Sequence, residues 1–225
     1  MPKFVTVIHD FIKDPEQFLN LTHSMESLSG LTTAGKHGLS KKRSAILSGQ
    51  ESDLVCQQIG QRLFESEAVS KFCFPRQATS PSLCRYDLDD YYDLHVDSPF
   101  SGDVRSDISF TAFLTSPTDY DGGELQVGLN DSRFIEIKPQ AGSLCLYDTG
   151  LPHRVRKVTR GRRVVAVGWI ESTVRDLNIR NILRDLYAVL DDLDTKFPDS
   201  LDQERYRLSS AITAILRDSS DRNPI

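Results

Sequence analysis

The sequence lacks the features that mark several classes of protein. No apolar run among its 225 residues approaches the roughly 18 residues of a membrane-spanning helix. Lys and Arg (27) do not outnumber Asp and Glu (32), so the net charge of −5 gives no electrostatic footprint for nucleic acid. The first ten residues hold too short an apolar run for a signal peptide, and no small-residue cleavage site follows. We therefore expect a soluble, cytoplasmic protein with no membrane and no nucleic acid among its partners.

The cysteines also lack a recognisable pattern. Cys56, Cys73, Cys84 and Cys145 lie far apart, and no CxxC spacing occurs. This favours buried free thiols in an intracellular protein over a disulfide framework. The sequence shows no internal repeat and no low-complexity linker. Its length suits one large domain, or one domain with a helical appendage.

Helices are expected on both sides of a β-rich middle. Asp14 as N-cap and Pro15 at the first helical position predict a helix whose apolar face would include Phe18, Leu19, Met25 and Leu28. A period near 3.6 residues predicts a second helix over residues 53–68.

Two further helices are expected after residue 172. An apolar stripe runs from Ile179 to Leu193 and ends before Phe197-Pro198-Asp199, and a second stripe runs from Leu201 to Leu216. Such stripes pack on the body of the domain or pair between subunits. The second reading gives a homodimer through the C-terminal helices.

The middle of the chain alternates short apolar stretches with turn residues. After a first strand at residues 4–8, the expected strands cover 83–86, 94–96, 108–114, 124–127, 133–137, 143–147, 153–158 and 163–169. Eight short antiparallel strands suit a double-sheet jelly roll, also called a double-stranded β-helix. The predicted fold class is therefore α+β. Residues 1–172 would form the jelly roll with its N-terminal helices, and residues 173–225 a C-terminal helical extension.

The segment His95-Val96-Asp97 carries the strongest chemical signal. On a strand, residues two apart point to the same face, so His95 and Asp97 would lie side by side. His153, from a later strand, would complete two imidazoles and one carboxylate, the facial triad of non-haem Fe(II) oxygenases. Each histidine taken alone would more often be structural, and this ligand set by itself does not exclude zinc.

Arg163 distinguishes these alternatives, because a hydrolytic zinc site needs no anchor for a keto acid. A guanidinium binds a carboxylate through two parallel hydrogen bonds, which suits the far carboxylate of a keto-diacid. Arg162 would face the other side of the strand. Trp169 shares the parity of Arg163, so its ring would line the site or pack in the core.

Several segments together resemble a known family. These are Thr33-Ala34-Gly35, Arg85-Tyr86, His95-Val96-Asp97, Arg105-Ser106-Asp107-Ile108-Ser109, Tyr120-Asp121-Gly122-Gly123-Glu124-Leu125, Pro139-x-Ala141-Gly142, His153, Thr159-Arg160-Gly161-x-Arg163-Val164 and Trp169-Ile170-x-Ser172-x-Val174-Arg175-Asp176. They keep their order and approximate spacing over nearly the whole chain. The sequence resembles the Fe(II)/2-oxoglutarate-dependent dioxygenases of the prolyl-4-hydroxylase type, in particular the bacterial PKHD-type hydroxylases.

The resemblance implies a reaction and its cofactors. His95, Asp97 and His153 would bind Fe(II), and Arg163 would bind the 5-carboxylate of 2-oxoglutarate. Tyr86 matches a strand tyrosine that can bond the same carboxylate, although a core tyrosine is an equal alternative. With O2, and with ascorbate implied by the family alone, decarboxylation of 2-oxoglutarate to succinate would be coupled to hydroxylation of a substrate C–H. The substrate would be a prolyl residue or another peptide, protein or small molecule.

Two rival functions remain at this stage. One is a metal-binding jelly roll that acts as a sensor or binding module without catalysis. The other is a structural subunit that uses the C-terminal helices as an interaction surface. Asp107 and Glu124 are not expected to form a catalytic pair, because the oxidation needs no acid/base dyad; Asp107 would pair with Arg105 instead.

Overall fold

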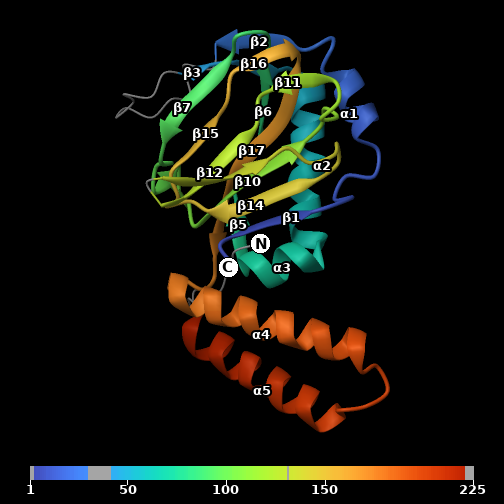
Figure 1. Cartoon of the computed structure of the whole chain (residues 1–225), viewed down its shortest axis with the longest axis vertical. Helices are drawn as coiled ribbons and strands as arrows, with labels where there is room; N and C mark the ends of the chain where they lie inside the picture. The colour runs from blue at the N-terminus through green and yellow to red at the C-terminus, as the bar shows by residue number, and fades with distance from the viewer. Residues whose placement is uncertain (1–2, 30–41, 131, 221–225) are drawn as a thin grey trace.

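The fold is built on two antiparallel sheets that face each other (Figure 1). The computed structural model describes residues 3–29, 42–130 and 132–220. The larger sheet contains, in spatial order, β1 (Val5–Ile8), β14 (Leu144–Asp148), β10 (Ile108–Phe113), β17 (Arg163–Ser172), β6 (Ser82–Tyr86), β4 (Ala45–Ser48) and β2 (Glu26–Ser29), with β5 (Pro75–Ala78) also on β17. The smaller sheet contains β13 (Arg133–Ile137), β12 (Leu125–Asn130), β15 (His153–Val155), β7 (Tyr91–His95) and β3 (Lys42–Arg43).

Two short ribbons complete the β-structure. β11 (Tyr120–Gly122) pairs with β16 (Val158–Gly161), and β8 (Phe100–Ser101) pairs with β9 (Val104–Arg105). All the strand pairs are antiparallel among the described residues. The predicted α+β jelly roll is confirmed.

The centre of the larger sheet is covered on both faces, which explains its apolar sequence. All six residues of β10 are buried. Ile108 and Phe110 belong to the core cluster shared with the N-terminal helices, whereas Phe113 belongs to the cluster between the two sheets. Because side chains alternate along a strand, Ser109 and Thr111 also face the smaller sheet.

The N-terminal helices differ from their prediction in extent. α1 (Pro15–Leu21) begins at the proline, but the Asp14 side chain makes no capping hydrogen bond. The helix ends before Met25 and Leu28, so these two residues were wrongly placed on its face. Met25 is buried in the core, and Leu28 is exposed on β2. A run of Ser, Thr and His residues ends the helix here, since such residues compete for backbone hydrogen bonds.

The expected second helix is divided into two. α2 (Gln50–Glu65) is followed by α3 (Glu67–Cys73), and Ser66 lies between them in an extended conformation. The Ser66 hydroxyl accepts the Val69 N–H, which makes it the N-cap of α3. The expected strand 153–158 is likewise interrupted after β15, and β16 runs from Val158 beyond the expected end to Gly161.

The two expected C-terminal helices are present as a hairpin that extends from one end of the sheets (Figure 1). Asp176 is the N-cap of α4 (Leu177–Lys196), and its carboxylate accepts the N–H groups of Asn178 and Ile179. α5 (Asp202–Ser219) packs against it. Their apolar stripes form a separate small core with Phe74 and Val174.

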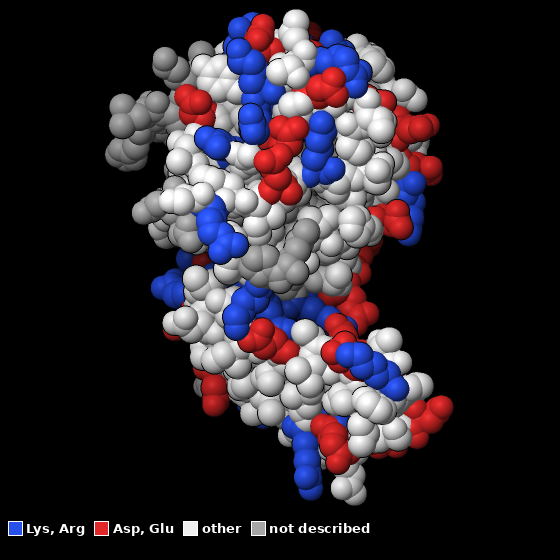
Figure 2. All heavy atoms as spheres, in the orientation of Figure 1, with Lys and Arg blue, Asp and Glu red and all other residues white. Residues whose placement is uncertain are grey.

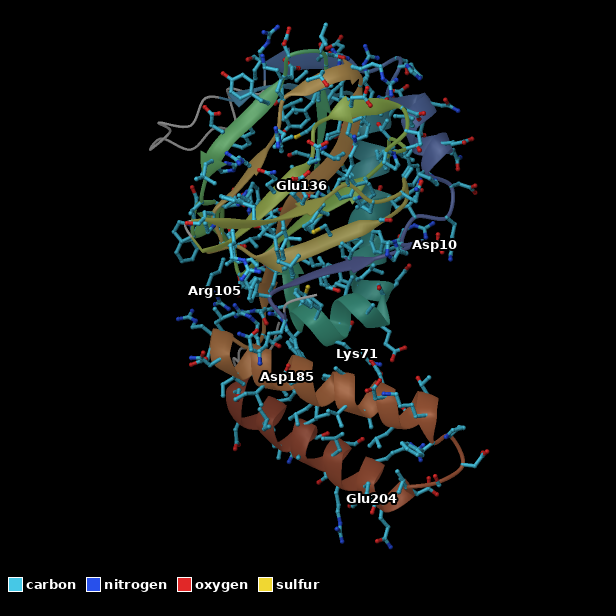
Figure 3. The ribbon with its side chains drawn as sticks, viewed as in Figure 1. Asp10, Lys71, Arg105, Glu136, Asp185 and Glu204 are labelled. Atoms are coloured by element: carbon cyan, nitrogen blue, oxygen red, sulfur yellow. The ribbon has the colours of Figure 1, made fainter. Side chains whose placement is uncertain are left out.

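Buried charges attach this hairpin to the sheets. Arg184 donates to both carboxylate oxygens of Asp148 at 3.0 Å and to the carbonyl oxygens of Phe72 and Lys3. Figure 3 shows Arg105 at the same junction, where it makes the expected pair with Asp107 at 3.0 Å. Lys71 reaches from α3 to Asp191 on α4 at 2.6 Å.

The cysteines and the helices agree with two further predictions from the sequence. The four cysteines are free and buried, as expected. In the described parts of the chain, every helix is too short or too polar to cross a membrane.

The attachment predicts that Arg184→Met strongly lowers the free energy of unfolding. Removing this guanidinium leaves the Asp148 carboxylate buried without its main partner, a change that costs about 3–5 kcal/mol in comparable sites. Urea unfolding should show a loss of this size. Lys3→Met is the matched control, because it removes an exposed pair with Asp185 and should cost about 1 kcal/mol or less. Equal losses in the two variants would contradict a structural role for the buried pair.

Candidate metal centre

A cavity of about 320 Å³ lies between the two sheets. Its wall contains residues from β6, β7, β10, β15 and β17, so it is formed by strands that are far apart in the sequence. Four of the lining residues carry ionisable acidic or basic side chains: His95, Asp97, His153 and Arg163. These are the four charged residues that the sequence singled out.

His95 and His153 are brought together by strand pairing. They are directly opposite each other in the β7–β15 pair, and their ring centroids are 4.2 Å apart. In each ring Nδ1 lies within hydrogen-bond distance of a backbone carbonyl two residues before it, at 2.7 Å for Asp93 and 3.0 Å for Leu151. An Nδ1–H that donates to these carbonyls leaves both Nε2 atoms as free acceptors that can bind a metal.

A β-bulge in β7 sets the direction of His95. Two residues lie between Tyr92 and His95, but only one lies between their partners Val155 and His153 on β15. The extra residue places Tyr92 and His95 on the same side of the sheet, and their rings stack with centroids 3.6 Å apart. Bulges of this kind commonly redirect side chains at active sites.

Asp97 joins the pair from outside the strand. The expected strand 94–96 is shifted, because β7 ends at His95 and Asp97 lies in the segment that follows. Strand alternation therefore does not explain its position. Its Oδ1 lies 3.6 Å from His95 Nε2, and its Oδ2 lies 3.6 Å from His153 Nε2. One ligand atom from each of the three residues lies within 4.8 Å of the others.

The protonation states suit metal binding. Burial opposes ionisation of Asp97, but hydrogen bonds from His95 and the Trp169 indole, together with the charge of the two imidazoles when protonated, outweigh it and lower the Asp97 pKa to about 2. Burial also lowers the pKa of His153 below its ordinary value of 6.5, and the Asp97 charge offsets this only in part. At neutral pH the set therefore holds a carboxylate and a neutral His153, which are the forms that bind metals.

Arg163 lies against the same cavity on β17. It is 1% exposed and is directly opposite Tyr86 in the β6–β17 pair. Its guanidinium carbon lies 5.0 Å from the Tyr86 ring centroid and 5.4 Å from that of Phe113. Among the described residues, its Nε and Nη1 groups have no hydrogen-bond partner. As expected, Arg162 faces the other way and bonds to Asp87.

Gly123 makes room for this arginine. A Cβ atom at Gly123 would lie 3.1 Å from Arg163 Cδ and 3.1 Å from the Tyr120 ring, and the residue has a φ of +66°. Tyr120 is fully buried, and its hydroxyl has no hydrogen-bond partner in the described part of the chain. Tyr120 was not identified as a site neighbour from the sequence, where it was noted only within a segment that carries the family resemblance.

Other expected residues lie outside this group. His9 contacts Ser143, and His23 follows α1 on the surface. His37 and the segment Thr33-Ala34-Gly35, which carries part of the family resemblance, lie outside the described residues. Trp169, left open between core and site, lines the cavity and donates its indole N–H to Asp97 at 2.9 Å.

The site fits a divalent transition metal and a carboxylate ligand. Two imidazoles and one carboxylate on one side of a cavity suit a non-haem Fe(II) centre with open positions. Two buried, unpartnered N–H groups of Arg163 suit a carboxylate, because unpaired buried donors are costly without an acceptor.

Comparisons with known proteins give the family. The family model described as 2OG-Fe(II) oxygenase superfamily matches residues 81–171. A PKHD-type hydroxylase of Gloeothece citriformis is 37% identical over 175 residues, covering 76% of this chain and 79% of that protein. A PKHD-type hydroxylase of Acaryochloris marina is 40% identical over 162 residues, covering 71% of this chain and 73% of that protein. The chain belongs to the 2OG-Fe(II) oxygenase superfamily and is a PKHD-type hydroxylase.

A solved structure supports the fold. The Pseudomonas putida prolyl-4-hydroxylase superposes with a TM-score of 0.54 at 20% identity, covering 75% of this chain and 92% of that one. As a member of its superfamily, this protein is an Fe(II)- and 2-oxoglutarate-dependent dioxygenase that hydroxylates a substrate. The rival reading as a non-catalytic module is set aside.

Arg163→Met should separate stability from 2-oxoglutarate binding. The substitution removes a buried cation with two unpartnered N–H groups and keeps an unbranched side chain. We expect the unfolding free energy of the ligand-free protein to be unchanged or higher. We also expect the KM for 2-oxoglutarate to rise, and the increase in melting temperature on adding 2-oxoglutarate with Mn(II) to disappear. A wild-type ligand shift in this variant would remove Arg163 from the anchor role.

The pKa of His153 predicts how stability depends on pH. Since burial lowers this pKa in the folded protein, the unfolded chain takes up a proton first as the pH falls below about 6.5. The stabilising contribution is therefore present above pH 6.5 and is lost toward acid. His153→Gln, which cannot titrate, should show a smaller loss of unfolding free energy between pH 7 and pH 5 in metal-free buffer. Parallel pH profiles would contradict this assignment.

Proposed function

We propose that His95, Asp97 and His153 are the iron ligands of this dioxygenase and that Arg163 anchors the 5-carboxylate of 2-oxoglutarate. The observation that carries this proposal is the meeting of one ligand atom from each of three residues within 4.8 Å, on the wall of the cavity that also holds the Arg163 guanidinium. When bound, iron and 2-oxoglutarate supply the oxidising chemistry. The chain supplies ligation, orientation and exclusion of water.

The arrangement divides the cavity by function. The two histidines present Nε2 because their Nδ1 atoms are occupied by carbonyl groups. Arg163 extends from the facing sheet, so a dicarboxylate would be held between two sheets. Tyr86 is proposed as a second contact of the same carboxylate, because it lines the cavity directly opposite Arg163.

We propose an uncharged target group in the substrate, such as a prolyl ring or another peptidyl side chain. The four charged lining residues are all assigned to the metal and the co-substrate. The other lining side chains are aliphatic, aromatic, hydroxyl or thiol groups. A target ammonium or carboxylate would thus lack an ionic partner in the cavity, and burying an unpaired charge is costly. The fold shared with a prolyl-4-hydroxylase agrees with this choice.

The remaining reaction partners follow from the same chemistry. O2 is proposed as the second co-substrate, because the coupled decarboxylation and hydroxylation consume one molecule of it. Ascorbate is proposed as an auxiliary reductant on the family resemblance alone.

We also propose a cytoplasmic location, a homodimer and no nucleic-acid partner. Four buried free thiols agree with a reducing compartment. Ile182, Val189 and Tyr206 are exposed apolar or aromatic residues on the C-terminal hairpin and are candidates for a subunit contact. On the face shown in Figure 2, acidic and basic side chains are interspersed, which agrees with the lack of a nucleic-acid site.

For the domain organisation we propose a dioxygenase unit of residues 1–172 and an extension of residues 173–225. The extension has its own small apolar core. Its attachment through Arg184 and Asp148 means that the two parts support each other and that the boundary is not a flexible linker.

The ligand assignment predicts the effect of three substitutions. His95→Ala, Asp97→Ala and His153→Ala should each abolish stoichiometric binding of Fe(II) and the formation of succinate from 2-oxoglutarate. Iron content would be measured after anaerobic loading, and succinate by mass spectrometry. His9→Ala is the matched control, since it removes an imidazole that contacts Ser143 and lies outside the candidate metal set. Wild-type iron content in any of the three variants would refute the assigned ligand set.

A further inference from the structure

Three directly paired residues cross the larger sheet beneath the candidate metal centre. Tyr147 on β14, Ser109 on β10 and Trp169 on β17 are register partners: Ser109 is opposite Tyr147 on one side and opposite Trp169 on the other. We call these three residues the cross-strand row. All three line the cavity. The row therefore belongs to the sheet that faces the two histidines.

Two residues of the cross-strand row donate hydrogen bonds to the same carboxylate oxygen. The Ser109 hydroxyl donates to Asp97 Oδ2 at 2.9 Å, and the Trp169 indole N–H donates to the same oxygen at 2.9 Å. Because Asp97 lies beyond the end of β7, no strand pairing fixes its backbone at that position. Its carboxylate is positioned by side chains from the opposite sheet.

The donor direction at Ser109 is fixed by chemistry. An ionised carboxylate can only accept hydrogen bonds, so the single hydroxyl proton of Ser109 points to Asp97. The Thr149 hydroxyl lies 3.0 Å from the Ser109 oxygen and must therefore donate to it. Thr149, Ser109 and Asp97 form an ordered chain, in which each hydroxyl has one direction. Hydrogen bonds to a charged acceptor are stronger than neutral ones.

We propose that Trp169 and Ser109 are positioning residues that orient the Asp97 carboxylate, so that Oδ2 is held by the larger sheet and Oδ1 is left as the atom that binds the metal. This inference rests on the proposed function, because it takes Asp97 as a ligand. It adds two residues of this chain that act on the metal through Asp97 and do not touch the metal themselves.

A packing role for Trp169 is the alternative, and it makes a different prediction. If the ring only fills space, Trp169→Phe keeps most of the contact and leaves metal affinity unchanged. If the indole N–H orients Asp97, the same variant weakens metal binding although an aromatic ring remains. Loss of such outer contacts to a ligand typically lowers metal affinity about 10–100-fold.

The experiment measures Mn(II) binding, which needs no turnover. The dissociation constant would be determined from the free Mn(II) signal in electron paramagnetic resonance for the wild type, Trp169→Phe, Ser109→Ala and the double variant. Ser143→Ala is the matched control, because it removes an equally buried hydroxyl just before β14, at the other end of the strand from Tyr147. We expect each single variant to bind about 10-fold more weakly, the double variant more weakly still, and Ser143→Ala to bind like the wild type.

Trp169 offers a second readout because it is the only tryptophan in the chain. Co(II) bound beside Asp97 should quench the intrinsic fluorescence, and in Ser109→Ala the midpoint of that quenching should move to higher Co(II) concentration. The Co(II) absorption spectrum of Trp169→Phe should also change, since a carboxylate without its anchors can rotate and present both oxygens. Thermal unfolding of the metal-free variants separates this effect from a general loss of stability.

The possible failures are distinguishable. If Asp97→Ala still binds Mn(II) like the wild type, the ligand assignment itself fails. If Asp97→Ala loses Mn(II) while both single variants and the double variant keep affinities within about twofold of the wild type, the ligand assignment stands and the positioning role is overturned. Lower melting temperatures with unchanged Mn(II) affinity would assign Trp169 and Ser109 to packing alone.

Discussion

The antiparallel pairing of β7 with β15 is the interaction on which the rest of the site depends. It places His95 opposite His153 although the two residues are far apart in the sequence. A jelly roll holds such strands rigidly because its two sheets share a core, here the cluster that includes Val127, Val155 and Val165. The facing sheet then contributes groups that the histidines alone do not provide: Arg163, the proposed anchor for a carboxylate, and two donors to Asp97.

The site also concentrates polar groups where the fold would otherwise be apolar. Arg163 is among the largest fully buried side chains, and two of its N–H groups have no acceptor within the described residues. Unpaired buried donors lower the stability of the ligand-free protein, which supports the proposal that Arg163 anchors a carboxylate ligand. At the junction with the C-terminal hairpin, by contrast, the buried charges of Arg184 and Asp148 are paired with each other. The contrast separates a binding site from a structural junction within one chain.

Much of this could be predicted from the sequence, and the failures have physical causes. The central strands of the larger sheet were predictable because both of their faces are covered, which makes residues 108–113 and 164–170 largely apolar. The edge strand β2 was missed because its four residues are exposed and leave no apolar signal. The division of α2 from α3 depends on one serine cap, which periodicity does not detect. His95, Asp97, His153 and Arg163 were identified because their residue types are specific. Ser109 was not identified, because its place beside Asp97 depends on the register of three strands, which a single serine in the sequence does not show.

The bulge between Tyr92 and His95 has a consequence for how this segment can vary. A regular strand would place Tyr92 and His95, which are three positions apart, on opposite faces, so the irregular pairing with β15 is what allows their rings to lie on the same face. The stretch from Tyr92 to Asp97 therefore behaves as one unit: an engineer who transplants His95 and Asp97 without the irregular pairing beside them would transfer the residues but not the stacking of Tyr92 on His95.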